Sequence, residues 1–117
     1  MSLLDPTPST ADSAFSNADM ATALKALASS RRLQILAWLK DPDTHFPTQV
    51  HGDKQRHGVC TQFIADKLAV SQPATSRHLR LLHEAGLVTA TPLKGWTYYR
   101  RNEQNLLRFK QQLSADL

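Results

Sequence analysis

Apolar residues recur along the first third of the chain at the spacing of α-helices, with polar residues between them. Behind a predicted cap at Asn17, a first helix is indicated by one apolar face, made by Met20, Leu24 and Leu27. Either Ser29 or Ser30 is expected to cap a second helix. Its apolar stripe comprises Leu33, Ile35, Leu36 and Leu39, and its outer face comprises Arg31, Arg32, Gln34 and Lys40.

The helical pattern resumes at Cys60 and predicts two short helices joined by a tight turn. The first of them ends near Ala69. We expect Ser71 to cap the second, with Pro73 just inside it, where a missing N–H group costs nothing. This helix is expected to stop at Gly86, because glycine readily adopts the backbone conformation that follows a helix.

A β-hairpin and a last helix complete the predicted elements. Strands are expected at residues 87–91 and 96–100, with a bend over residues 92–95 between them. Asn102 is expected to cap the last helix, whose inner side carries Leu106, Phe109 and Leu113. The predicted order is α-α-α-α-β-β-α, a mainly α fold with a small β-hairpin wing, which is the layout of a winged helix-turn-helix.

Two stretches show no sustained period. Residues 1–16 are rich in Ser, Thr, Pro, Ala and Asp, and we expect a flexible N-terminal arm there, followed by one domain over residues 17–117. Residues 41–59 contain two prolines, two glycines and three histidines. We expect a long loop over these residues, with a short extended piece near Val50.

The predicted helix-turn-helix carries the residues that we expect to contact double-stranded DNA. A small residue, Ala65, stands where its two helices must cross closely. Gln72, Ser76 and Arg77 are expected to contact base edges, because Gln and Arg form paired hydrogen bonds with adenine and guanine in the major groove. The residues expected to hold the DNA backbone are Ser71, Thr75, Arg80, Lys94 and Arg100.

Other interpretations of these polar and aromatic positions stay open. An ordinary amphipathic helix with a solvated polar face would carry similar residues. His78 lies at the boundary of the polar and apolar faces, so both a DNA contact and a packing role are open. Strand alternation divides Trp96, Tyr98 and Tyr99 between two faces, and at least one is expected in the core. An aromatic surface for single strands is the alternative.

Composition narrows the class of protein. The 117 residues suit one domain, and the net charge of +4 favours an anionic partner such as nucleic acid. A single cysteine excludes an intrachain disulfide, and neither a membrane-spanning run nor a secretory signal is visible. We therefore expect a cytoplasmic protein. No paired acid and base, nucleophile motif or phosphate-cradling glycine loop is present, so we expect no enzyme.

Four segments together resemble a known family. Residues 26–36, 71–79, 82–88 and 96–100 have the sequences ALASSRRLQIL, SQPATSRHL, LHEAGLV and WTYYR. They are similar to the ArsR family of winged-helix repressors, and the resemblance covers residues 21–101. It implies a homodimer that is assembled from the first and last helices and represses from a two-fold operator. It also implies release by an effector, which the residues do not identify.

The sequence departs from that family at its usual metal sites. The family's sensors place a Cys-x-Cys pair before the turn, and here Cys60 is followed by Gln62 at the second position. The last helix has no histidine for the other site, so we expect no metal and no cofactor. His45, His51 and His57 are either solvated loop residues or, with Cys60, ligands for zinc. Cys60 could otherwise sense redox state through a disulfide across a dimer.

Two further questions stay open on sequence alone. The first and last helices carry apolar residues that either a second copy or the chain's own core must bury. These residues are Phe15, Met20, Leu24, Leu106, Leu107, Phe109 and Leu113. The alternatives to a DNA-binding repressor are a winged-helix protein-interaction module and a metal or thiol sensor that uses Cys60 and the loop histidines.

Overall fold

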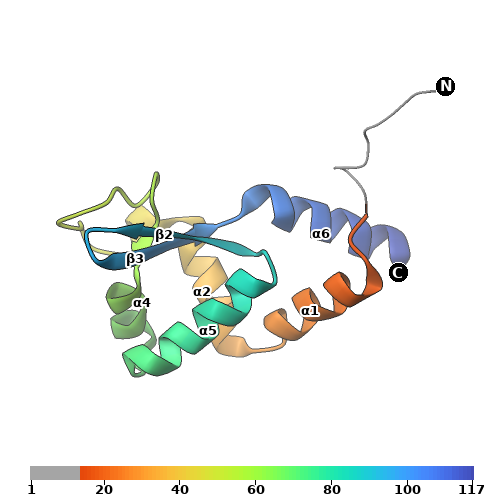
Figure 1. The fold of residues 1–117 in the computed structure, drawn as a ribbon, viewed down its shortest axis with the longest axis horizontal. Coiled ribbons are helices and arrows are strands. Elements are labelled where there is room, and N and C mark those ends of the chain that lie inside the picture. The colour runs from red at the N-terminus through yellow and green to blue at the C-terminus, as the bar shows by residue number, and fades with distance from the viewer. Residues whose placement is uncertain (1–13) are drawn as a thin grey trace.

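The computed structural model describes residues 14–117, so most of the predicted arm at residues 1–16 lies outside the described residues. Six helices and three strands are formed in this part of the chain (Figure 1). In chain order they are α1 (Asn17–Leu27), α2 (Ser30–Lys40), α3 (Pro42–His45), β1 (Val59–Cys60), α4 (Thr61–Leu68), α5 (Gln72–Glu84), β2 (Val88–Leu93), β3 (Trp96–Arg101) and α6 (Glu103–Asp116). The predicted fold class is confirmed, and the order differs by the additional elements α3 and β1.

Side-chain caps fix where the longer helices begin. The Oγ atoms of Ser29 and Ser71 accept the backbone N–H groups of the residues three positions on, and Asn102 caps α6 in the same way. The predicted cap of α1 at Asn17 is wrong by one residue. Ser16 Oγ accepts the Asp19 N–H at 3.0 Å while Asp19 accepts the Ser16 N–H at 3.3 Å, a reciprocal capping box.

The stretch predicted as one long loop contains two short elements. Pro42 starts the four-residue helix α3, where its fixed φ suits a first helical position. The extended piece expected near Val50 is wrong, because Val50 is 93% exposed and belongs to no strand. The extended backbone is instead β1, which the side chain of Gln49 ties down. Its amide donates to the Gly58 carbonyl at 3.1 Å, and its carbonyl accepts the Cys60 N–H at 2.8 Å.

The sheet has the order β1-β3-β2, and both pairings are antiparallel. Val59 and Cys60 of β1 lie opposite Tyr99 and Tyr98 of β3. The hairpin turn is tighter than the bend predicted over residues 92–95, because only Lys94 and Gly95 lie outside the strands. Both residues have positive φ, 56° and 81°, as a two-residue hairpin turn requires.

One hydrophobic core joins the helices to the sheet, which lies over α2, α4 and α5 (Figure 1). Its fully buried side chains are Ile35, Ile64, Thr75, Leu79, Leu82, Leu87, Val59 and Val88. Tyr98 is buried, which confirms that at least one of the three aromatic residues of the hairpin lies in the core, whereas Trp96 is 47% exposed. The predicted stripe of α2 is wrong at Leu33, which is 52% exposed because it lies about 200° around the helix from Ile35.

Helices α1 and α6 form the end of the molecule opposite the hairpin (Figure 1). The Gln112 side chain joins α6 to the segment just before α1, since it accepts the Phe15 N–H at 2.7 Å and donates to the Phe15 carbonyl at 2.8 Å. Met20, Leu106 and Phe109 are buried within the chain itself. Leu24 and Leu107 remain 45% and 52% exposed, so the chain's own core covers only part of the apolar surface of these two helices.

Candidate nucleic-acid interface

Helices α4 and α5 and the turn between them form a compact helix-turn-helix. Ala65 is 2% exposed, in keeping with a small residue where the two helices pack. Helix α4 ends at Leu68 and is followed by Ala69, whose left-handed φ of 58° lets its N–H and that of Val70 satisfy the last carbonyls of the helix. Ser71 then caps α5 at once, and this short connection fixes the direction in which α5 leaves the turn.

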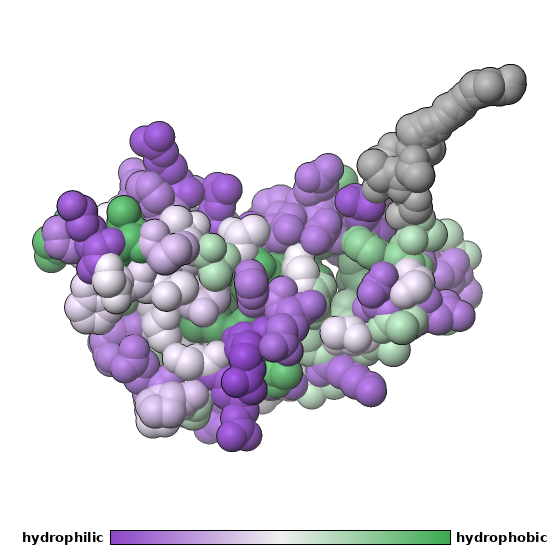
Figure 2. Space-filling view, in the orientation of Figure 1, coloured by the Kyte–Doolittle hydropathy of each residue, from purple (hydrophilic) through white to green (hydrophobic). Residues whose placement is uncertain are grey.

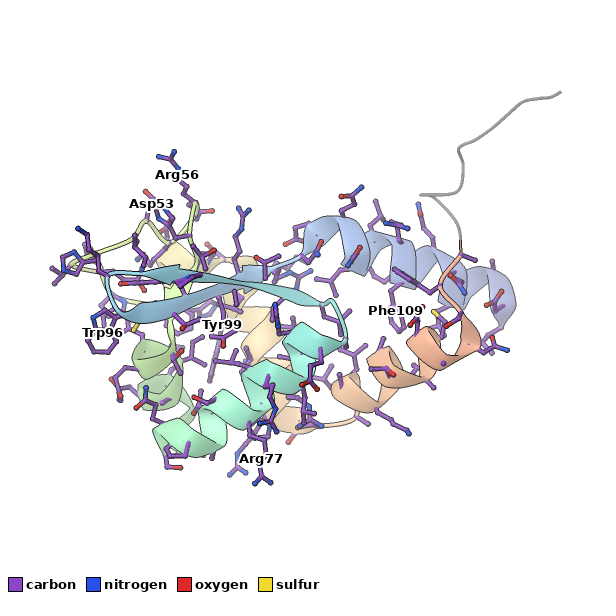
Figure 3. All side chains as sticks on the ribbon, viewed as in Figure 1. Asp53, Arg56, Arg77, Trp96, Tyr99 and Phe109 are labelled. Carbon is purple, nitrogen blue, oxygen red and sulfur yellow. The ribbon has the colours of Figure 1, made fainter. Side chains whose placement is uncertain are left out.

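Helix α5 has one fully buried face and one polar exposed face. Thr75, Leu79 and Leu82 are all 0% exposed and hold the helix against the core. The exposed face comprises Gln72, Ser76, Arg77, Arg80, His83 and Glu84, with Ser71 and Pro73 exposed at the start of the helix. Arg77 projects from the lower edge of the molecule, where the surface is strongly hydrophilic (Figures 2 and 3).

The structure brings together most, but not all, of the sequence-predicted residues of α5. Ser71, Gln72, Ser76, Arg77 and Arg80 are solvent-exposed on or beside this helix. Arg80 lies 3.8 Å from Glu84 one turn on, an exposed ion pair of the kind that contributes little and exchanges readily. These five side chains are therefore accessible to a second molecule that lies against α5.

Thr75 departs from the prediction that it holds the DNA backbone. Its side chain is fully buried, and its Oγ1 donates to the Ser71 carbonyl at 3.0 Å. Because this hydroxyl faces the protein, Thr75 is not available to contact the DNA backbone. The spacing of Thr75 with Leu79 and Leu82, which is that of one helix face, was the sequence signal that places it in the core.

His78 lies between the two faces and is half-buried. Its Nδ1 atom lies 3.0 Å from Nη1 of Arg32, a side chain of α2. Burial lowers the pKa of His78, and the neighbouring charges of Arg32, Arg31 and Arg77 lower it further. The sequence predicts Arg32 on the outer face of α2. It does not reveal the contact with His78, because periodicity does not distinguish Arg32 from Arg31.

The hairpin presents the two remaining candidates. Lys94 is exposed at its tip, and Arg100 is exposed on β3. Arg101, the next residue, is engaged within the protein, because it donates to both carboxylate oxygens of Glu103 and to the Leu36 carbonyl. Tyr99 is half-buried against the core and Tyr98 is buried, so Trp96 is the exposed ring among these three residues, which disfavours an aromatic surface for single strands.

The possible metal ligands His45, His51, His57 and Cys60 are spread over α3, the loop that follows it and β1. Within residues 14–117 no group of three His, Cys, Asp or Glu side chains is arranged to hold a metal ion. His57 accepts the Asp53 N–H through Nδ1 at 2.8 Å, and His51 is exposed. Cys60 is buried and lines a mainly apolar pocket of about 360 Å³ with Phe63 and Trp96. No helix of the described part of the chain is long and apolar enough to cross a membrane.

Comparison with known proteins places this arrangement in context. Residues 60–90, which hold the helix-turn-helix and the start of the wing, match the family model of the bacterial regulatory proteins of the arsR family. The chain is 40% identical over 93 residues to YbzH of Bacillus subtilis (strain 168), an uncharacterized HTH-type transcriptional regulator. This match covers 80% of the chain and 93% of that relative.

The solved structures that share the fold include two regulators of bacterial origin. One is the homodimeric winged helix-turn-helix DNA-binding domain of Mb0332 from Mycobacterium bovis, a possible ArsR-family regulator determined by solution NMR. It is 29% identical with a TM-score of 0.59, and the match covers 85% of this chain and 80% of that one. The other is the transcriptional regulator HlyU of Vibrio vulnificus CMCP6, 31% identical with a TM-score of 0.51, with 84% and 88% covered.

Proposed function

The chain belongs to the ArsR family of winged helix-turn-helix transcriptional regulators, and from this premise we propose that it is a homodimeric repressor that binds a two-fold operator in double-stranded DNA. The observation that carries this proposal is the two-faced helix α5. Three fully buried side chains hold one face against the core, and over the first two turns the opposite face exposes Gln72, Ser76 and Arg77, with Pro73 beside them. Such a helix fits the width of the major groove.

Sequence would be recognised by the first two turns of α5. Gln72, Ser76 and Arg77 stand at the positions that enter the groove first in this class of motif. Gln72 suits adenine, and Arg77 suits guanine, because each side chain forms a pair of hydrogen bonds with that base. Each such pair contributes about 1–3 kcal/mol of discrimination against the wrong base.

The DNA backbone would be held at both ends of this surface. The Ser71 hydroxyl and the backbone N–H of Gln72 would meet one phosphate, favoured by the positive end of the helix dipole. Arg80 releases Glu84 to meet another, at little cost for so exposed a pair. Lys94 and Arg100 contact the DNA from the hairpin.

The second copy would pack on α1 and α6. Leu24 and Leu107 remain about half-exposed on these helices, and Figure 2 shows apolar surface at this end of the molecule. The related Mb0332 domain is homodimeric. A two-fold dimer places two copies of α5 about 34 Å apart, which is one turn of DNA. An effector that changes this spacing would release the repressor.

Gel-shift titration against the DNA upstream of its own gene tests the proposal. Arg77→Ala is compared with Arg56→Ala, which removes the same charge from the loop on the opposite edge of the molecule (Figure 3). We expect Arg77→Ala to weaken specific binding by about 5- to 150-fold, from about 1–3 kcal/mol, and Arg56→Ala to leave it within about twofold. No specific complex at moderate salt would favour the protein-interaction module instead.

A further inference from the structure

Arg32 is anchored at the carbonyl end of helix α1. Its Nε donates to the Ala26 carbonyl at 2.6 Å, and Nη2 lies 3.4 Å from the Lys25 carbonyl. The backbone N–H of Arg32 donates to Ser29 Oγ, which caps α2. The last carbonyls of a helix lack partners within it and carry its negative end, so they hold a guanidinium well. This side chain therefore has a fixed orientation, although it belongs to neither helix of the helix-turn-helix.

The remaining nitrogen of that guanidinium determines which atom of His78 carries the proton. Nη1 of Arg32 lies 3.0 Å from Nδ1 of His78. An arginine side chain is always protonated and can only donate, so Nδ1 must accept. A neutral imidazole with an accepting Nδ1 carries its proton on Nε2. Burial and the three nearby arginines lower the pKa of His78, which keeps the ring neutral at neutral pH.

The Nε2 atom of His78 is available to a partner outside the protein. Within residues 14–117 it has no hydrogen-bond partner. It is also not a buried atom, so solvent reaches it. His78 directly follows Arg77 on α5, at the edge of the face that we propose for DNA. Its two ring nitrogens thus serve separate purposes, one for packing and one for contact.

We propose that Arg32 is a positioning residue that presents His78 to the operator as a hydrogen-bond donor through Nε2–H. His78 then selects an acceptor on the DNA and disfavours the amino groups of adenine and cytosine. Acceptors are N7 of either purine, O6 of guanine, O4 of thymine and the phosphate oxygens. This inference rests on the proposed DNA binding, but its first step is a property of the free protein.

The first test therefore needs no DNA. Two-dimensional 15N–1H NMR of the histidine rings at pH 8 distinguishes the protonated from the unprotonated ring nitrogen. We expect wild-type His78 to be protonated at Nε2 alone. Arg32→Met, which keeps the unbranched stem but removes the guanidinium donors, should give a mixture of both tautomers, whereas Arg31→Met, the same change of charge one residue earlier, should not. Protonation at Nδ1 in the wild type would overturn the proposal even if Arg32→Met failed to fold.

The second test measures the coupling on DNA by a double-mutant cycle in fluorescence anisotropy. Arg32→Met should bind the selected operator about fivefold more weakly than Arg31→Met, as expected for one hydrogen bond of about 1 kcal/mol. In a His78→Ala background the same substitution should add less than twofold, because the group it positions is gone. Loss of base preference at one position would identify a base acceptor, and a uniform loss would identify a phosphate. Equal losses in both backgrounds would refute the positioning role.

Discussion

Gly58 brings the loop before α4 directly against the backbone of the wing. Its φ is +106°, which side chains with a Cβ rarely adopt. A Cβ at this position would overlap the carbonyl group of Tyr99 and lie 2.8 Å from the backbone nitrogen of Arg100. Because these atoms belong to the backbone of β3, no side-chain rotation relieves the overlap. Gly58→Ala must therefore separate β1 from β3.

The expected cost has two parts that a control variant separates. A left-handed backbone conformation costs an alanine about 1–2 kcal/mol. Loss of the short β1–β3 pairing, at about 1 kcal/mol for each hydrogen bond, adds about 2 kcal/mol. Gly95→Ala pays only the first part, because Gly95 has a φ of +81° and open space around its Cβ position. We expect about 3–4 kcal/mol for Gly58→Ala and about 1–2 kcal/mol for Gly95→Ala.

Thermal unfolding followed by far-ultraviolet circular dichroism measures this difference. All proteins are compared at one concentration, because association shifts the apparent stability. A difference of about 2 kcal/mol corresponds to roughly 8 °C in Tm for a domain of this size. If Gly58→Ala melts at the same temperature as Gly95→Ala, the loop does not approach β3 as described and the reasoning is refuted.

Three further predictions follow from particular contacts. Thr75→Val should lower the free energy of unfolding in urea by about 1 kcal/mol while leaving operator affinity within about twofold, and a tenfold loss of affinity in the folded variant would return Thr75 to the DNA surface. Leu107→Glu should shift the protein toward monomer in sedimentation equilibrium, whereas Val50→Glu, at a position that is 93% exposed, should not; equal behaviour would refute the proposed dimer surface. The free energy of unfolding should fall as the pH drops below about 6.5, because the pKa of His78 is lowered in the folded chain and the unfolded chain takes up its proton first. That contribution is complete above pH 6.5 and is lost as the pH falls through the folded-state pKa, so the wild type should show a steeper loss than His78→Ala.

Local patterns were sufficient to predict the hairpin and every described helix except α3. The serines that cap α2 and α5 and the asparagine that caps α6 satisfy N–H groups only three residues away, so each start is a property of a few neighbours. The same holds for the turn at Lys94 and Gly95. These local features also place Gln72, Ser76 and Arg77 together on one exposed face of α5.

Contacts between distant parts of the chain could not be predicted in this way. Strand β1 has only two residues and no period of its own, and it exists because Val59 and Cys60 pair with β3 some forty residues later. The contact between Arg32 and His78 likewise joins positions 46 residues apart. Thr75 differs from its prediction for another reason, because its polarity indicates an exposed position whereas its spacing with Leu79 is that of the buried face. Its hydroxyl is satisfied by its own helix, which makes burial tolerable.

Selection of bound sequences from a pool of random double-stranded DNA tests the central claim most directly. The wild type and Arg56→Ala should enrich the same inverted repeat, with half-sites about one turn, or about 10 base pairs, apart. The double variant Gln72→Ala/Arg77→Ala should lose the base preference within each half-site while retaining weak, salt-sensitive binding. Failure of the wild type to enrich any sequence, or an enriched sequence that the double variant leaves unchanged, would contradict recognition by helix α5.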